Sequence, residues 1–233
     1  MPAEAGTTKL PAEARTTNFN LLYNARMEVE QDSVDSLLKR VDEFFMAKGP
    51  VHQTMRALAR RLSQEGIEYA VVGGMALVLH GYRRETVDVD VLLSKEGRES
   101  FFENLVGRGY TPSFPGAQKG FRDTETGVEI DILTQGEFPG DGKPKPVSFP
   151  NPAGASIEID GIRIVPLEKL IELKLASGMT APHRLRDLAD VQELIKILRL
   201  PADLAERLDS YVRDKYLELW NTVADSASLE EPG

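Results

Sequence analysis

Residues 71–93 read VVGGMALVLHGYRRETVDVDVLL, and this stretch decides the fold. It begins with an apolar strand that ends in Gly73-Gly74, continues as a short apolar helix, and closes with a second apolar strand that contains Asp88 and Asp90. Because side chains alternate between the two faces of a strand, residues two positions apart project from the same face. Adjacent carboxylates repel each other, so this pattern favours a bound cation, most often a divalent metal.

Each half of the stretch also has a simpler interpretation. Glycines between a strand and a helix let a phosphate approach free backbone N–H groups, but a tight turn needs the same residues. Asp88 and Asp90 would be ordinary on the solvated face of an edge strand. Their apolar neighbours favour a largely buried strand instead: Val87, Val89, Val91, Leu92 and Leu93.

A third acid, Asp131, lies within another apolar strand, in the segment EIDIL at 129–133. Three carboxylates on neighbouring central strands provide the oxygen ligands that Mg²⁺ prefers, with Mn²⁺ as an alternative ion. Two such ions can activate an attacking hydroxyl and stabilise a leaving pyrophosphate. The sequence therefore predicts a site for two Mg²⁺ ions, held by Asp88, Asp90 and Asp131.

The rest of the chain alternates between helical and strand patterns. We expect a flexible tail at 1–27, a core with its N-terminal helices at 28–165, a helical C-terminal part at 166–222 and a frayed tail at 223–233. The expected helices are 33–47, 52–64, 75–80, 95–106, 166–178, 183–198 and 203–220. The expected strands are 68–72, 87–93, 110–114, 120–123 and 128–133, followed by a hairpin at 157–164 with an Asp-Gly turn. The fold class is α/β (α+β): a small mixed β-sheet flanked by helices, with a helical C-terminal part.

The segment 135–156 holds five prolines and four glycines and shows no periodic pattern. A loop of this length within a compact domain is usually functional or disordered.

Composition restricts the function classes. The chain has 233 residues and no cysteine, which excludes disulfides, thiolate zinc sites and cysteine nucleophiles. No apolar run approaches the roughly 20 residues that span a bilayer, and the first residues lack an apolar signal core, so we expect a cytoplasmic protein without a membrane partner. The net charge of −9 gives no general electrostatic help in binding nucleic acid.

The order Gly-Gly, Asp-x-Asp and a third Asp on a later strand resembles the nucleotidyltransferase superfamily, whose best known member is DNA polymerase beta. The fuller text of 71–93 resembles its minimal bacterial branch, which includes the abortive-infection type nucleotidyltransferase toxins. The resemblance covers residues 68–198. It implies that Gly73 and Gly74 face the triphosphate, and that Asp88, Asp90 and Asp131 are catalytic metal ligands.

A second set of residues lies in the helical part. Lys174 lies seven residues after Leu167, on a helix face that should be apolar. It either reaches the edge of that face or points toward the nucleotide phosphates. The resemblance pairs it with Arg186 and Asp187 on the next helix, which makes Lys174 and Asp187 catalytic and adds Lys174 and Arg186 to the nucleotide-binding residues.

Simpler roles exist for the second helix. Asp187 lies near the start of its helix, where an acid is favourable on dipole grounds alone. Arg186 and Asp190 are four residues apart and would also form a helix-surface pair.

Two further candidates lie between the glycine turn and the acids. Arg84 is on a loop that must run close to a bound nucleotide, so it is a candidate phosphate contact, although a loop arginine is ordinarily solvated. Thr86 is a candidate for a bond to the nucleotide or to the backbone.

The resemblance implies a Mg²⁺-dependent enzyme that moves an NMP from an NTP onto a hydroxyl and releases pyrophosphate. The acceptor would be RNA, especially a tRNA end, as in the toxin-like relatives, or a small hydroxylated molecule, as in antibiotic-modifying relatives. A toxin would also have an antitoxin protein as a partner. The rival hypothesis is a non-catalytic nucleotide-binding module or a partner in a toxin–antitoxin pair.

Overall fold

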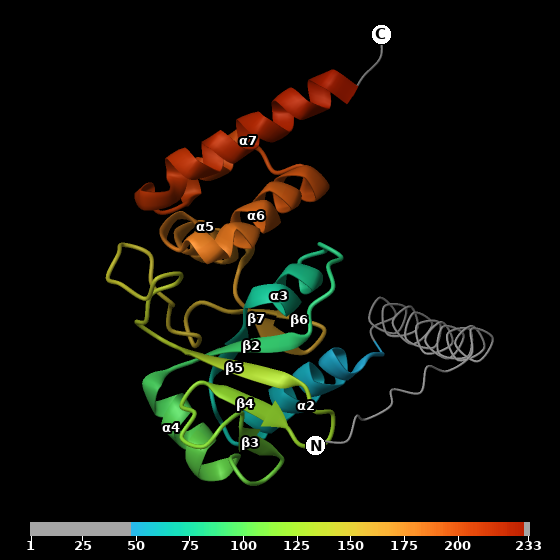
Figure 1. Cartoon of the computed structure of the whole chain (residues 1–233), viewed down its shortest axis with the longest axis vertical. Coiled ribbons are helices and arrows are strands. Elements are labelled where there is room, and N and C mark those ends of the chain that lie inside the picture. The colour runs from blue at the N-terminus through green and yellow to red at the C-terminus, as the bar shows by residue number, and fades with distance from the viewer. Residues whose placement is uncertain (1–47, 231–233) are drawn as a thin grey trace, which may run out of the picture. The chain divides into compact units, whose positions relative to one another are not determined.

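The computed structural model describes residues 48–230, with side chains described up to residue 226. The expected tail at 1–27 and the expected helix at 33–47 lie outside the described residues. Figure 1 shows the arrangement of the described part, with a β-sheet in its lower half and α5, α6 and α7 above it.

The centre of the fold is a mixed seven-stranded sheet with the strand order β3-β4-β5-β2-β1-β7-β6. The strands are β1 (Tyr69–Val71), β2 (Asp88–Leu93), β3 (Tyr110–Pro112), β4 (Gly120–Asp123), β5 (Glu129–Thr134), β6 (Ile157–Ile159) and β7 (Ile162–Ile164). Strand β2 pairs antiparallel with β1 and parallel with β5. The mixed sheet flanked by helices confirms the expected fold class.

The register of the parallel pair positions the acids. Asp90 on β2 lies directly beside Asp131 on β5, and Asp88 lies beside Glu129. Since the side-chain period of a strand is two, Asp88, Asp90 and Asp131 all belong to the same face of the sheet.

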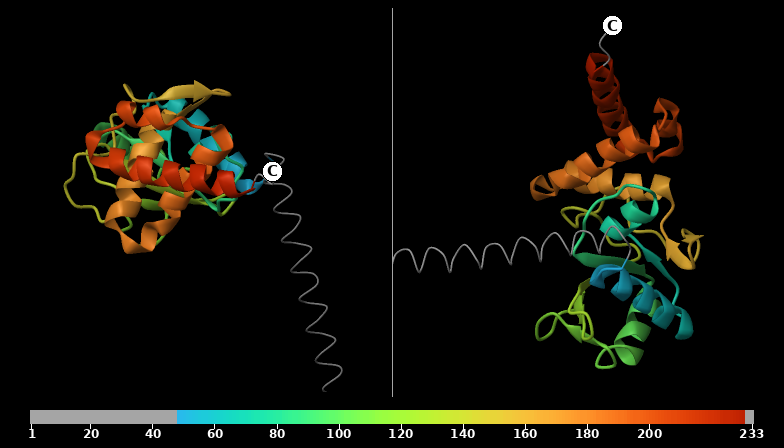
Figure 2. Two further views of the ribbon diagram at one scale, coloured as in Figure 1. Left: turned by 90° about the horizontal axis from the view of Figure 1, so that it is seen from above. Right: turned by 90° about the vertical axis from the view of Figure 1, so that its right-hand side faces the viewer.

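Helices cover both faces of the sheet (Figures 1 and 2). On one face lie α2 (Pro50–Gln64) and α4 (Lys95–Asn104), and on the other lie α3 (Gly73–Leu79) and the C-terminal helices. Under α4 the aromatic rings of Phe101 and Phe121 pack edge to face with their centroids 5.1 Å apart. Ser94 caps α4, since its side chain accepts a hydrogen bond from the Gly97 amide at 2.9 Å.

The C-terminal part consists of α5 (Leu167–Thr180), η1 (Pro182–Arg184), α6 (Leu185–Leu198), η2 (Ala202–Arg207) and α7 (Ser210–Glu230). These helices share an apolar core with the sheet that includes Ile171, Leu175, Val191, Leu194, Val212 and Tyr216. Within the described residues, no helix is both long enough and apolar enough to cross a membrane.

Three features of the expected helices in this part are wrong. The helix expected at 166–178, which is α5, continues through Gly178 to Thr180. A Cβ at Gly178 would lie 2.5 Å from Leu188 Cγ, so this glycine allows α5 and α6 to pack closely and does not stop the helix. The last expected helix is interrupted between η2 and α7 around Leu208, and α7 continues past Trp220 to Glu230.

The strand boundaries differ less. The hairpin is confirmed, and Asp160 and Gly161 both have the positive φ that a type I′ turn requires, 50° and 74°. Val87, expected within the buried acidic strand, is 74% exposed and precedes β2.

The segment 135–156 contains no helix or strand, as expected. The two ends of the loop are joined because the Gly136 amide donates to the Phe149 carbonyl at 2.9 Å and the Phe149 amide donates to the Glu137 carbonyl at 2.9 Å. Further along, Lys145 donates to Asp141 at 2.6 Å. Gly140 lies so close to α5 that a Cβ would be 2.8 Å from the Ser177 carbonyl oxygen. The loop therefore packs closely against the end of α5.

Candidate active site

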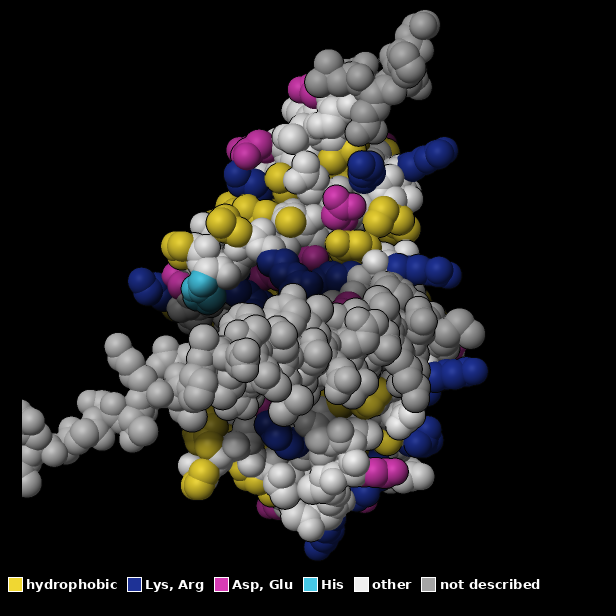
Figure 3. Space-filling model, turned by 45° about the vertical axis from the view of Figure 1, so that its right-hand side comes forward, with side chains coloured by type: hydrophobic (Ala, Val, Ile, Leu, Met, Phe, Trp, Pro, Cys, Tyr) yellow, Lys and Arg dark blue, Asp and Glu magenta, His cyan; other side chains and the backbone are white. Residues whose placement is uncertain are grey.

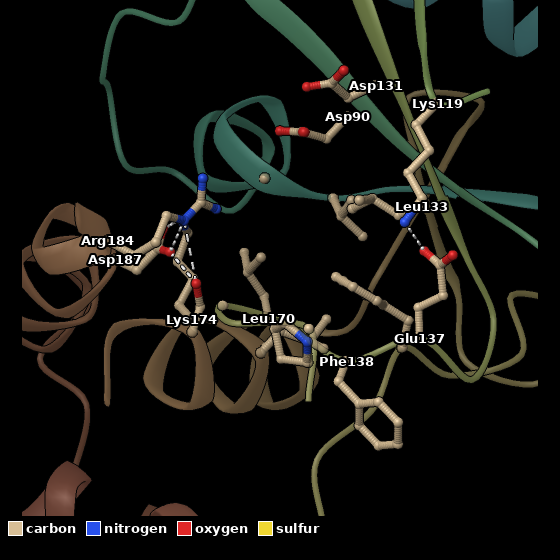
Figure 4. Close-up of a pocket in the computed structure, with 18 of the residues that line it drawn as sticks. Asp90, Lys119, Asp131, Leu133, Glu137, Phe138, Leu170, Lys174, Arg184 and Asp187 are labelled. Carbon is tan, nitrogen blue, oxygen red and sulfur yellow. Dashed lines mark hydrogen bonds and ion pairs between the residues drawn. The ribbon is translucent and has the colours of Figure 1, made fainter. Parts of the chain in front are cut away.

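The acidic face of β2 and β5, the start of α3, the loop 135–156 and helix α5 enclose a cavity of about 560 Å³. Of the residues singled out from the sequence, five line it: Gly73, Asp90, Asp131, Lys174 and Asp187. Figure 4 shows the two carboxylates on one side and Lys174, Asp187 and Arg184 on another. The rest of the wall includes apolar side chains, among them Leu133, Phe138, Phe149, Leu170 and Leu173.

The glycine pair forms the first turn of α3 and is not a separate turn before it. Gly73 has φ +60°, and a Cβ on it would lie 1.8 Å from Asp90 Oδ2. A Cβ on Gly74 would lie 2.5 Å from Thr86 Oγ1. Both positions need glycine because the backbone of α3 lies directly against the side chains of Asp90 and Thr86, which leave no room for a Cβ.

We predict that Gly73→Ala disrupts the site. The new methyl group must displace the Asp90 carboxylate, and the left-handed backbone adds about 1–2 kcal/mol of strain. Gly66 is a matched control, because it has φ +66° and no heavy atom lies within 4 Å of the place where its Cβ would be. We expect Gly66→Ala to lose about 1–2 kcal/mol of unfolding free energy in urea, and Gly73→Ala to lose clearly more. Equal losses in the two variants would contradict the close approach of Gly73 to Asp90.

The carboxylates disturb each other's ionisation. Burial, followed by the charges of Asp88 and Asp131, raises the pKa of Asp90 to about 7. Asp131 is more exposed, and partial loss of hydration together with the charges of Asp88 and Glu129 raises its pKa. The site thus concentrates negative charge, which a bound cation would stabilise.

Asp88 and Thr86 form a pair beside the cavity and do not line it. Thr86 is buried, and its hydroxyl donates to Asp88 Oδ1 at 2.6 Å. Thr86 therefore orients the Asp88 carboxylate. A bond from Thr86 to the nucleotide stays a prediction.

Lys174 is buried, with 7% of its surface exposed, so it does not reach the edge of its helix face. Its ammonium donates to Asp187 Oδ1 at 2.9 Å and to Asp190 Oδ2 at 2.8 Å. Although burial raises the pKa of Asp187, the Lys174 charge and the hydrogen bond from Ser177 outweigh it, and the net shift is downward. Lys174 and Asp187 are therefore held together as ions between α5 and α6.

The loop before β2 is tied to the same cluster. Arg84 Nη1 donates to Asp190 Oδ2 at 3.3 Å, and Asp190 is 2% exposed. Asp190 is thus a buried partner of Lys174 and Arg84, which excludes the alternative of a helix-surface pair with Arg186. Arg186 is exposed and does not line the cavity, and neither does Arg84.

The family resemblance assigned no role in the active site to Arg184, which lines the cavity from η1. Its Nε donates to Asp187 Oδ2 at 2.9 Å and to Ser177 Oγ at 3.3 Å. The spacing of Arg184 and Asp187, three residues apart at the start of a helix, is the signal that could have found it. Lys119 and Glu137, which form an ion pair at 2.8 Å and also line the cavity, carried no signal in the sequence.

Within residues 48–230, no group of three or more His, Cys, Asp or Glu side chains is arranged so that it alone could hold a metal ion. Mg²⁺, however, is usually bound by one or two carboxylates together with waters and substrate phosphates. Asp90 and Asp131 are adjacent in register and offer hard oxygen donors in a site crowded with negative charge. Their chemistry therefore fits Mg²⁺ held jointly with a phosphate-bearing substrate.

Comparisons with known proteins were made at three levels. No family model and no curated protein matches the chain. Several solved structures are similar to it. They include nucleotidyltransferases and a protein named as nucleotidyltransferase-like.

One of these structures is a candidate nucleotidyltransferase from H. pylori, with 18% identity over 78% of this chain and 96% of its own, at a TM-score of 0.42. A second is an antigenic nucleotidyltransferase-like protein from Paracoccidioides brasiliensis, with 15% identity over 62% of this chain and 75% of its own, at a TM-score of 0.41. A third is the antibiotic-resistance factor ANT(2'')-Ia in complex with adenylyl-2''-tobramycin, with 14% identity over 71% of this chain and 92% of its own, at a TM-score of 0.42. None of the three is named as an abortive-infection toxin.

Proposed function

We propose that this protein is a nucleotidyltransferase that moves an NMP from an NTP onto a hydroxyl group and releases pyrophosphate. One observation carries the proposal. Asp90 and Asp131 lie side by side on the parallel strands β2 and β5, with Asp88 on the same face. The backbone of Gly73 closes this face so tightly that no side chain fits there. The resemblance of the motif to the nucleotidyltransferase superfamily supports the same reaction.

In the proposed reaction Asp88, Asp90 and Asp131 hold Mg²⁺ together with the nucleotide. When bound, the ion supplies positive charge to the phosphates and makes the acceptor hydroxyl more acidic. The hydroxyl oxygen attacks the α-phosphorus, and the bond from that phosphorus to the bridging oxygen of the β-phosphate breaks. Asp131, on the same face of the sheet, accepts the hydroxyl proton.

The remaining contribution of the chain is to position the substrates. The cavity would hold the triphosphate between the acids of the sheet and the cations of the helical part. Catalysis of this kind depends on geometry and on charges that are fixed in advance.

The test is to follow the label from two forms of each NTP, labelled at the α- or at the γ-phosphate, with Mg²⁺ present. One arm supplies total RNA as the acceptor and another supplies an extract of small hydroxylated metabolites. We expect α-label on the acceptor of one arm and γ-label in pyrophosphate, with both signals absent in Asp88→Asn. Transfer of γ-label to the acceptor would indicate a kinase, and nucleotide binding without any transfer would favour the non-catalytic module.

A further inference from the structure

We propose that Arg184 is the residue of the helical part that binds the triphosphate chain of the nucleotide, and that Asp187 and Ser177 serve to position it. This inference rests on the proposed function for the identity of the ligand. It concerns a residue outside the sequence motif, and it changes the role expected for Asp187.

The first step is the charge of the cluster. Lys174 and Arg84 are cations, and both donate to Asp190. Lys174 also donates to Asp187, so two cations and two carboxylates are arranged around one another. The charges of these four side chains cancel. Arg184 is the fifth member of the cluster, and it adds one positive charge that no carboxylate of the cluster neutralises.

The second step is the direction of that charge. Arg184 is anchored through Nε alone, which donates to Asp187 and Ser177, and no terminal guanidinium nitrogen has a partner among the described residues. Arg184 lines the same cavity as Asp90 and Asp131, so its guanidinium shares that space with the carboxylates of the sheet. Figure 4 shows the guanidinium extending from the Asp187 side toward Asp90.

The third step is accessibility. The side chain of Arg184 is 54% exposed, whereas those of Lys174 and Asp187 are each 8% exposed. Lys174 is committed to two carboxylates, so it is less available to a ligand than the guanidinium is. Figure 3 shows Lys and Arg side chains gathered on this view below the C-terminal helices. A guanidinium held at Nε with its terminal nitrogens free is the arrangement that binds phosphate oxygens in pairs.

The role of Asp187 follows from its contacts. Its Oδ1 accepts from Lys174, and its Oδ2 accepts from both Arg184 and Ser177, the latter at 2.6 Å. Both oxygens are thus occupied by the protein. Asp187 is therefore a positioning residue that acts through Arg184, since each of its oxygens already accepts a hydrogen bond from the protein.

The test measures binding in the presence of Mg²⁺ and uses inorganic tripolyphosphate as a probe that has no base or sugar. The same titrations are made with ATP, GTP, CTP, UTP and the corresponding monophosphates. For Arg184→Gln we expect an affinity for tripolyphosphate, and for the NTP that binds, about 10- to 100-fold below wild type, which is the range for a lost charged hydrogen-bonding partner. Monophosphate affinity should change less than about threefold.

Two arginine variants complete the test. Arg207→Gln is the matched control, because Arg207 is also exposed, makes one ion pair with Glu168 and does not line the cavity. It should bind tripolyphosphate like wild type. Arg186→Gln tests the alternative that Arg186, the arginine that the family resemblance implies, binds the nucleotide. Unchanged binding in Arg184→Gln, or a selective loss in Arg186→Gln alone, would overturn the assignment.

Asp187→Asn tests the positioning role. It should weaken tripolyphosphate binding selectively, and the double variant Arg184→Gln/Asp187→Asn should lose no more than Arg184→Gln alone, because both changes remove the same interaction. Additive losses would contradict the positioning role. If Asp187→Asn fails to fold, Arg184→Gln, which changes an exposed side chain, still decides whether Arg184 binds the triphosphate.

The two proposals can fail separately. Selective tripolyphosphate binding that depends on Arg184, without any transfer of α-label, would remove the proposed function and keep this inference. Transfer of α-label by an Arg184→Gln variant with unchanged tripolyphosphate affinity would keep the function and remove the inference.

Discussion

Asp90→Asn is expected to lower the rate of nucleotidyl transfer about 10²- to 10³-fold. An amide keeps the size of the side chain but removes the negative charge that the proposed metal site needs, and the loss of one electrostatic contact in an active site typically costs a factor in this range. The measurement is the initial rate of pyrophosphate release at saturating NTP and Mg²⁺. A rate within about tenfold of wild type would show that Asp90 takes no direct part in the reaction.

The same substitution should stabilise the metal-free protein. Since burial and the charges of Asp88 and Asp131 raise the pKa of Asp90 to about 7, its ionised form is unfavourable in the folded chain at pH 8. Asparagine removes that cost. We expect the melting temperature in EDTA at pH 8 to rise by at least about 2–4 °C, the change that accompanies 1 kcal/mol in a chain of this size.

Asp123→Asn is the matched control for both effects. Asp123 is also a buried aspartate in a strand, but its partners are the Thr54 hydroxyl at 3.2 Å and the Glu125 amide at 2.9 Å. It lies outside the cavity lining. This variant should melt at a lower temperature than wild type and keep the transfer rate of the folded protein. A stability gain in both variants, or in neither, would contradict the mutual repulsion of the acids in the site.

Lys174→Ala is expected to cost about 3–5 kcal/mol of unfolding free energy, the usual result of removing one partner from a buried ion pair. Without Lys174, the carboxylates of Asp187 and Asp190 remain buried, with one hydroxyl and two arginines as their remaining partners. Urea unfolding at pH 7.5 measures the loss. The variant should also be inactive, because the cluster joins α5 and α6 on the side of the cavity opposite the acids.

Lys215→Ala serves as the control for Lys174. Lys215 pairs with Glu218 on α7, where the Glu218 side chain is 62% exposed. An exposed pair of this kind contributes about 0–1 kcal/mol. If Lys174→Ala cost no more than Lys215→Ala, the cluster would not be the buried network that the distances describe.

The sequence was most informative where chemistry and local pattern coincide. An acid within an apolar strand is unusual enough to be noticed, and Asp88, Asp90 and Asp131 were found on this ground alone. Their alignment across β2 and β5 depends on strand pairing, which no local pattern specifies. Ser94 and the Asp-Gly hairpin were equally predictable, because a helix cap and a type I′ turn each depend on a few adjacent residues.

The helical side of the site was harder to predict, because its contacts join distant segments. Asp190 looked like a surface residue on its own helix, yet its partners Arg84 and Lys174 are 106 and 16 residues away in the sequence. The local pattern predicts that the helix ends at Gly178. A glycine is needed there because Leu188, on the next helix, approaches too closely for a Cβ, and the local sequence does not reveal that contact. The family resemblance gave a role to Arg186 and none to Arg184, whereas in the structure Arg184 lines the cavity and Arg186 is exposed outside it.

The most direct test of the account is a crystal structure with Mn²⁺ and an NTP analogue that has a non-hydrolysable bond between the α- and β-phosphates. Mn²⁺ replaces Mg²⁺ in such sites and can be located by its anomalous scattering. We predict an anomalous peak about 2.1 Å from carboxylate oxygens of Asp90 and Asp131 and from an oxygen of the α-phosphate. A triphosphate bound away from β2 and β5, or Mn²⁺ bound without contact to either aspartate, would contradict the central claim.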